Sequence, residues 1–239
     1  MVHESHSSLI HLVAKRQMPN QQKPHQEAVL FDFDGTLGRS LKAWTSSYHG
    51  ALREIGVDCS EAQVREACFS KRGVDVQSEF AIQDIAAFAE DVWSRVLAKM
   101  PEVEMYPHVE ETLRNLGLAS FRLGVVTNTR RAHLDAALER WAVGELFHVR
   151  VTIDDVSRGK PDPEAVHAAL EGLKVPAERA WLVGDSPADI EAGRAAGVRT
   201  IAFSPEENQQ YFARELLEKL KPTHVAHSYQ DVQRFIRRS

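Results

Sequence analysis

The chain has 239 residues, of which 43% are hydrophobic and 26% charged, proportions that fit one large globular domain or a core with an insert and argue against disorder. Lys and Arg total 29 and Asp and Glu total 34, giving a formal charge of −5, which disfavours nucleic acid and anionic membranes as partners. The two cysteines form no CxxC pair and no apolar run approaches the roughly 20 residues of a membrane helix, so we expect a cytoplasmic protein.

The predicted elements begin after a polar N-terminal extension, residues 1–26, whose one apolar stretch is too short for a signal peptide. The first strand signal runs from Ala28 to Asp34 and stops at Gly35. Later runs typical of buried strands cover 123–127, 149–153, 180–184, 200–203 and 223–226. Amphipathic segments between them predict helices at 107–118, 130–141, 163–172, 187–196 and 206–220. Buried strands that alternate with helices predict an α/β fold with a doubly wound, Rossmann-like parallel sheet.

A long stretch after the first strand breaks this alternation, because it shows only helical periodicity. We therefore expect an inserted all-helical domain, here called the cap, at residues 39–105. The α/β core would consist of residues 27–38 and 106–239. Aromatic residues at helical spacing in the cap, Trp44, Tyr48 and Phe88, are expected in its interior, with the wall of a pocket as the alternative.

Polar residues gather where predicted strands end. The first strand ends with Asp32 and Asp34, which the alternation of side chains along a strand places on the same side. Other strand ends and one loop supply Thr127, Asn128, Lys160 and Asp185. In an open parallel sheet ligands bind at the carboxyl ends of the strands, so we expect these groups to converge.

The residue types at these positions indicate phosphoryl chemistry. Adjacent carboxylates repel each other and commonly hold a cation or share acid–base work, and a set of oxygen ligands suits Mg²⁺. A hydroxyl, an amide, a lysine and backbone N–H groups suit the oxygens of a phosphoryl group. An aspartate beside such a metal can attack phosphorus and form an aspartyl-phosphate.

Four segments in this order resemble the four motifs of the haloacid dehalogenase-like hydrolases. They are Asp32-Phe33-Asp34-Gly35-Thr36-Leu37, Thr127-Asn128, Lys160-Pro161 and Gly184-Asp185-Ser186-Pro187-Ala188-Asp189. The resemblance covers roughly residues 27–205 and is nearest to the phosphatase branch typified by phosphoglycolate phosphatase. The helical insert likewise resembles the cap of the subgroup in which the cap follows the first motif.

The resemblance implies a role for each matching residue. Asp32 would be the nucleophile, Asp34 the general acid and then the general base, and Lys160 the group that orients Asp32. The phosphoryl group would be bound by Gly35, Thr36, Thr127 and Asn128. Mg²⁺ would be held by Asp32, Asp34 through its backbone carbonyl, Asp185 and Asp189, although Asp189 fits equally well as a residue that caps the following helix.

The substrate implied is a small phosphorylated metabolite, phosphoglycolate-like or a sugar phosphate, and pyrophosphate and nucleoside monophosphates stay open. A basic turn of the cap, with Lys71 and Arg72, would bind a carboxylate or a second phosphate on the leaving group. The alternative is that this turn is a solvated helix end. The motif departs from the family at Arg39, where an acid is usual; this segment leads into the cap, so we expect the change to bear on which leaving group is bound.

Two other functions fit the same frame. A phosphosugar mutase would return the phosphoryl group to the sugar, and a non-catalytic binding protein would keep the fold without turnover. The binding protein is disfavoured because Asp32, Asp34, Lys160 and Asp185 are all present. A dehalogenase is disfavoured because halide loss needs neither a metal nor a second acid. We expect a monomer or a homodimer.

Overall fold

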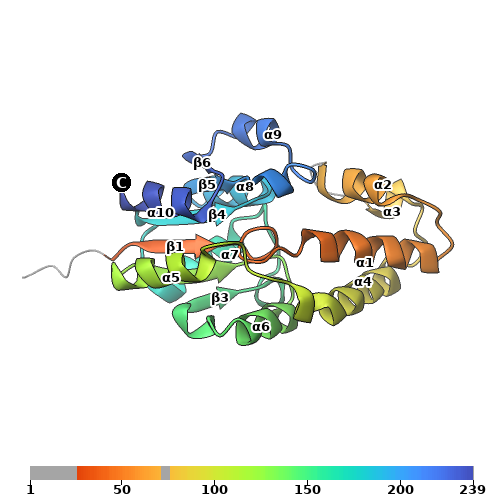
Figure 1. Ribbon diagram of the computed structural model, residues 1–239, viewed down its shortest axis with the longest axis horizontal. Coiled ribbons are helices and arrows are strands. Elements are labelled where there is room, and N and C mark those ends of the chain that lie inside the picture. Colours follow the sequence, from red (N-terminus) through yellow and green to blue (C-terminus); the bar gives the residue numbers. More distant parts are fainter. Residues whose placement is uncertain (1–25, 71–75, 239) are drawn as a thin grey trace, which may run out of the picture.

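The computed structural model describes residues 26–70 and 76–238 and shows an α/β core with helices at one end (Figure 1). Most of the N-terminal extension, residues 1–25, and the basic turn with Lys71 and Arg72 lie outside the described residues. None of the described helices is both long enough and apolar enough to cross a bilayer.

Six parallel strands form one sheet in the order β3-β2-β1-β4-β5-β6. Their bounds are β1 Ala28–Phe31, β2 Arg122–Val126, β3 Val149–Val151, β4 Ala180–Gly184, β5 Arg199–Phe203 and β6 His224–Ala226. Because β1 pairs with β2 on one side and with β4 on the other, the strand order reverses beside β1. The carboxyl ends of the strands at such a point form the crevice in which doubly wound sheets bind ligands.

Helices cover both faces of the sheet, and alternate side chains of β1 pack against the helices on opposite faces. Val29 and Phe31 belong to the apolar cluster that includes α5, α6 and α10, whereas Ala28 and Leu30 belong to the cluster with α7 and α8. The bounds of the core helices are α5 Val109–Leu118, α6 Arg131–Arg140, α7 Glu164–Leu173, α8 Pro187–Ala195, α9 Arg214–Lys219 and α10 Tyr229–Arg237. The doubly wound prediction is confirmed.

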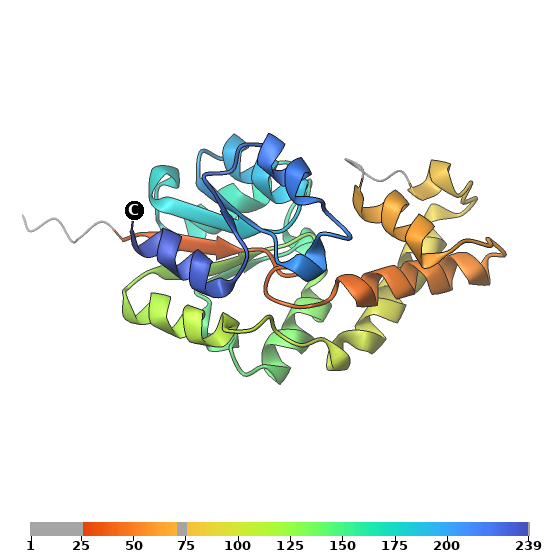
Figure 2. The same ribbon diagram turned by 45° about the horizontal axis from the view of Figure 1, so that its top comes forward.

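The regular elements described in the cap between residues 40 and 102 are all helical. They include α1 Leu41–Glu54, α2 Glu61–Arg65, a π-helical turn Glu66–Ser70, α3 Val76–Glu79 and α4 Ile85–Lys99. The two long helices, α1 and α4, pack against each other. Figure 2 shows the cap helices beyond the carboxyl end of β1. Ser60 caps α2 through a reciprocal pair with Gln63, and the Asp84 side chain caps α4.

The two connections between core and cap run side by side. The backbone N–H of Arg39 donates to the Glu104 carbonyl over 2.8 Å, and that of Tyr106 donates to the Leu37 carbonyl over 3.1 Å. The two chain segments therefore hold each other where the cap begins and ends. The predicted cap limits of 39 and 105 fall in this paired segment, although the division into two domains at these residues stays a prediction.

Two expected elements differ from the structure. The first strand ends at Phe31, before the two aspartates, and the helix predicted over 206–220 is wrong in its first half. A 3-10 turn at Glu206–Asn208 and an irregular segment precede α9 there. The cause is tertiary, because the side chain of Asn208 is buried against the loop that follows β1. Other 3-10 turns lie at Met100–Glu102, Gly144–Leu146, Ile153–Asp155 and Ala177–Arg179.

Candidate active site

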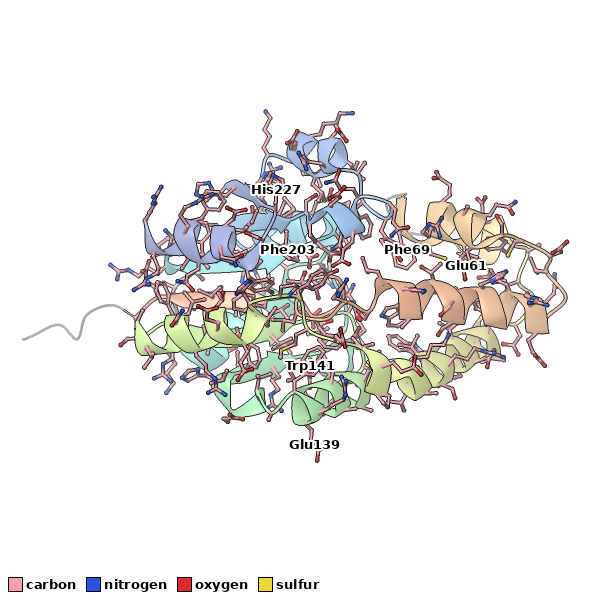
Figure 3. All side chains as sticks on the ribbon, in the orientation of Figure 1. Glu61, Phe69, Glu139, Trp141, Phe203 and His227 are labelled. Atoms are coloured by element: carbon pink, nitrogen blue, oxygen red, sulfur yellow. The ribbon has the colours of Figure 1, made fainter. Side chains whose placement is uncertain are left out.

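A cavity of about 310 Å³ lies between the carboxyl ends of the strands and the cap. The core contributes Asp32, Asp34, Thr127, Asn128, Thr129, Lys160, Asp185, Ser186 and Ala188 to its lining. The cap contributes Leu41, Trp44, Tyr48, Cys68, Phe69 and Trp93. Figure 3 shows Phe69 on the side of the cap that faces the core. The structure thus brings together the predicted polar residues of four separate segments.

Lys160 is the buried cation of the cavity. Its Nζ lies 2.7 Å from Asp32 Oδ1 and 2.5 Å from Asp189 Oδ1, and it donates to the Val126 carbonyl over 2.9 Å. Burial opposes the charge, but the attraction of Asp189 and Asp32 outweighs it and raises the pKa of Lys160 above its usual range. All three protons of the ammonium group have acceptors, so Lys160 fixes the orientation of Asp32.

The carboxylates around Lys160 carry more negative charge than it balances. Asp32, Asp185 and Asp189 each offer an oxygen within 4.8 Å of the others, and all three are buried. Burial, with the nearby charge of Asp189, raises the pKa of Asp32 to about 7, and burial raises the pKa of Asp185 well above its usual range. A buried set of oxygen ligands with excess negative charge fits a hard divalent cation such as Mg²⁺.

Asp34 faces the same cavity but makes different contacts. The Ser40 hydroxyl donates to Asp34 Oδ1 over 2.5 Å, and the Thr129 hydroxyl donates to Oδ2. Burial raises the pKa of Asp34 above the usual value, which favours a protonated form. A carboxyl group that is held by hydroxyls and kept off the lysine is suited to proton transfer, so the acid–base role of Asp34 stays a prediction that this geometry supports.

Asp189 serves two structural tasks at once. Its Oδ2 accepts hydrogen bonds from the Ser186 backbone N–H over 3.1 Å and from the Ser186 hydroxyl over 2.6 Å, which completes a capping box at the start of α8. Its Oδ1 faces Lys160. The capping role expected of Asp189 is therefore present, and direct metal ligation stays a prediction.

The loop after β1 packs on Asp185. Gly35 has a φ of +72°, and a Cβ at this position would lie 2.1 Å from Asp185 Oδ2, so only glycine fits. The Thr36 hydroxyl is buried and donates to Asp185 Oδ1 over 3.4 Å. In this structure both residues position Asp185, while their part in binding a phosphoryl group stays a prediction.

Thr127 and Asn128 follow β2, as the sequence predicts. Both line the cavity, but the amide of Asn128 binds the Lys160 backbone at both ends, donating to its carbonyl and accepting from its N–H over 2.8 Å each. Thr127 Oγ1 accepts from the backbone N–H of Thr129 over 3.1 Å. Asn128 therefore holds the loop that carries the lysine, and binding of a phosphoryl group by this pair stays a prediction.

Asn208 is a site residue that the sequence did not reveal. Its Nδ2 donates to the Gly35 carbonyl over 2.8 Å and to Asp185 Oδ2 over 3.3 Å, and its Oδ1 accepts from the Tyr106 hydroxyl over 2.5 Å. It thereby joins the loop after β1, the proposed metal ligand and the second connection to the cap. The surrounding segment has helical spacing and therefore gave no signal for this role.

We expect Asn208→Leu to lower the free energy of unfolding by about 2–4 kcal/mol. The substitution keeps the bulk but leaves buried polar groups without partners, each of which costs about 1–3 kcal/mol. Urea denaturation measures the change, and Gln230→Leu, which alters an exposed amide in the first turn of α10, is the control. Equal stability of the two variants would contradict the role assigned to Asn208.

The chain matches the family model described as haloacid dehalogenase-like hydrolase over residues 29–203. It is 34% identical over 180 residues to the pyrophosphatase PpaX of Bacillus cereus, which covers 74% of this chain and 82% of the relative. The pyrophosphatase PpaX of Bacillus mycoides is 31% identical over 208 residues, or 85% of this chain and 94% of the relative.

Solved structures agree in fold. CbbY from Rhodobacter sphaeroides in complex with phosphate has a TM-score of 0.73 at 25% identity and covers 87% of this chain and 96% of its own. A predicted phosphoglycolate phosphatase from Haemophilus somnus has a TM-score of 0.72 at 22% identity, with 88% and 98% covered.

The chain therefore belongs to the haloacid dehalogenase-like hydrolases. Within that family it is an enzyme of the phosphatase class, which acts on phosphorylated small molecules.

Proposed function

We propose that this phosphatase depends on Mg²⁺ and hydrolyses a small phosphorylated metabolite through an aspartyl-phosphate at Asp32. The observation that carries the proposal is the division of work between two carboxyl groups. Lys160 orients Asp32 beside Asp185. Asp34 lies in the same cavity and accepts hydrogen bonds from two hydroxyl groups, those of Ser40 and Thr129.

In the first step Asp32 attacks phosphorus. Lys160 occupies Oδ1 of the carboxylate, so we assign the attack to Oδ2. The new bond joins Oδ2 to phosphorus, and the bond between phosphorus and the leaving oxygen breaks. Asp34 donates its proton to that oxygen, which leaves as an alcohol. The raised pKa of Asp34 supports this order, because burial favours the form that carries a proton.

In the second step water cleaves the aspartyl-phosphate. Asp34, now a carboxylate, takes a proton from the water as its oxygen attacks phosphorus. The bond between phosphorus and Asp32 Oδ2 breaks, which restores the Asp32 carboxylate and releases inorganic phosphate. Ser40 and Thr129 keep Asp34 in one place for both proton transfers.

The residues suited to hold Mg²⁺ are Asp32, Asp185 and the backbone carbonyl of Asp34, with Asp189 as ligand or as support through Lys160. Bound there, the ion would supply charge neutralisation for the phosphoryl oxygens. Thr36 and Asn208 hold the two oxygens of Asp185 from the protein side, which fixes the direction of the carboxylate.

We expect Mg²⁺ to stabilise the folded protein even without substrate. A ligand at 100 times its Kd adds about 2.7 kcal/mol to the free energy of unfolding. Urea denaturation with Mg²⁺ or with EDTA measures the difference, which Asp185→Asn is expected to abolish and Asp58→Asn, an exposed carboxyl in the cap, to retain. A Mg²⁺ effect of equal size in Asp185→Asn would contradict the metal site.

Release of inorganic phosphate from a panel of phosphate esters, with and without Mg²⁺, tests the reaction itself. Pyrophosphate belongs in the panel because the relatives at 34% and 31% identity are named pyrophosphatases. A phosphosugar mutase would move the phosphoryl group within the sugar and release little phosphate. Mg²⁺-dependent release that exceeds transfer supports the hydrolase, and transfer without release would replace it with the mutase.

A further inference from the structure

On the cap side of the catalytic cavity, the described lining residues are mostly aromatic and carry no charge. They are Leu41, Trp44, Tyr48, Cys68, Phe69 and Trp93. Among the described residues that line the cavity, Lys160 is the only cation, and its three protons already have acceptors. The described part of the cap thus offers nothing to balance a second phosphate or a carboxylate on the leaving group.

The aromatic side chains form two groups around the cavity. Trp44 meets Trp93 edge to face with ring centroids 4.8 Å apart, and Tyr48 lies 6.1 Å from Trp44. In the second group, Phe69 of the cap packs edge to face against Phe212 of the core, with ring centroids 6.1 Å apart. Of the three cap aromatic residues expected in the cap interior, Trp44 and Tyr48 thus line the pocket, whereas Phe88 is buried and outside that lining.

Trp44 brings an incompletely paired hydrogen-bond donor to this cavity. The residue is only 8% exposed, and among the described residues its Nε1 has no hydrogen-bond partner of normal geometry. The nearest acceptor is Asp34: a hydrogen bond from Trp44, of less than normal geometry, is among the interactions that hold the pKa of Asp34 down against the effect of burial. A buried indole N–H ordinarily finds a well-placed acceptor, so a donor that reaches only the proposed general acid, and with poor geometry, points to a better acceptor supplied by the substrate.

We propose that the substrate is a phosphate monoester of a flat, uncharged aromatic alcohol. This inference rests on the proposed function and names its substrate class. The ring packs against Trp44, Tyr48 and Trp93, and the indole N–H of Trp44 donates to the ester oxygen that Asp34 protonates. The alcohol leaves with that proton while phosphorus passes to Asp32.

Other leaving groups fit this wall poorly. The second phosphate of pyrophosphate would place a charged group against aromatic rings, where desolvation is costly and the described cap residues at the cavity offer no cation. A sugar would bury several hydroxyl groups where the described cap residues at the cavity offer the Trp44 N–H, the Tyr48 hydroxyl and the Cys68 thiol, and unpaired hydroxyl groups weaken binding. An aromatic ring replaces water with offset or edge contacts instead.

The test compares kcat/KM for benzyl phosphate, isobutyl phosphate and pyrophosphate with Mg²⁺ present. Benzyl and isobutyl esters have alkyl-type leaving oxygens, so the comparison reports on the ring. We expect benzyl phosphate to exceed both others by about tenfold or more, since aromatic contacts of this kind are worth about one decade. Trp44→Leu should remove that preference. Trp44→Phe keeps a ring but loses the donor and should lower kcat/KM about two- to tenfold.

The matched control is Phe80→Leu, because Phe80 is an aromatic residue of the cap outside the cavity lining, and its preference should stay that of the wild type. A binding measurement that uses no Trp44 variant tests the proposal even if the Trp44 variants fold poorly. Isothermal titration of benzylphosphonate and isobutylphosphonate into wild-type protein and Asp32→Asn should show tighter binding of the aromatic compound to both.

The outcomes separate the two proposals. Turnover of pyrophosphate or isobutyl phosphate at least equal to that of benzyl phosphate, with equal binding of the two phosphonates, overturns the aromatic substrate and leaves the phosphatase mechanism in place. The same holds if Trp44→Leu keeps the full preference. No phosphate release from any ester by folded wild-type protein with Mg²⁺ overturns the proposed function, and the substrate class falls with it.

Discussion

Asp32→Asn is expected to lower phosphate release on the order of 10⁴-fold or more while the protein stays folded. An amide oxygen is a poor nucleophile, and loss of a nucleophile commonly removes most of the rate enhancement of an enzyme. Asparagine has nearly the same shape as aspartate, and its Oδ1 can still accept from Lys160, which now lies 2.7 Å away. The loss should therefore appear in kcat with little change in the unfolding transition.

Inorganic phosphate release under single-turnover conditions measures the effect, and Asp58→Asn, an exposed carboxyl-to-amide change in the cap, is the matched control. The control should retain wild-type turnover. Activity of Asp32→Asn within tenfold of the wild type would remove Asp32 as the nucleophile. Asp34, which faces the same cavity, would then be the next carboxylate to test.

The sheet and the position of the site were predictable from local patterns. Buried strands of a doubly wound sheet are continuous apolar runs, and ligands bind where such strands end. Asp32, Thr127 and Asp185 follow β1, β2 and β4 directly, so their convergence required only the topology. Lys160 follows no strand directly; it was expected at the site from its place in a loop before a helix, and its role toward Asp32 came from the resemblance.

The direction of individual side chains was not predictable, because it depends on partners distant in sequence. Asn128 was expected to bind a phosphoryl group, yet its amide holds the backbone of Lys160, 32 residues away. Asn208 lies 173 residues from Gly35, whose carbonyl it binds. Helical spacing records which face of a segment is apolar and carries no information about such a contact.

The aromatic residues on the cap side of the cavity were also only partly predictable from the sequence. Spacing predicted Trp44, Tyr48 and Phe88 in the interior of the cap, with a pocket wall as the alternative, and packing divided them, because only the first two line the cavity. The poorly paired N–H of Trp44 is likewise a result of this packing, and no sequence motif indicates it. The position of Trp44 relative to Trp93 depends on how α1 packs against α4, which no local pattern specifies.

Lys160→Met is expected to destabilise the protein and to abolish turnover. The lysine and its two partners are almost inaccessible, with side chains 3%, 9% and 0% exposed for Lys160, Asp32 and Asp189. Removal of one member of a buried ion pair costs about 3–5 kcal/mol, because the remaining charge is buried without a partner. Methionine fills a similar volume, so the loss reports on charge rather than on a cavity. Urea denaturation in EDTA measures it.

A second substitution separates charge balance from a general packing defect. In Lys160→Met/Asp189→Asn one carboxylate is removed together with its cation, so the double variant should be more stable than the sum of the single changes predicts, by about 1–3 kcal/mol. Turnover should stay absent, because Asp32 has still lost the group that orients it. Additive destabilisation would contradict the coupling between Lys160 and Asp189. Recovery of turnover in the double variant would show instead that Lys160 matters to catalysis only as the counter-ion of Asp189.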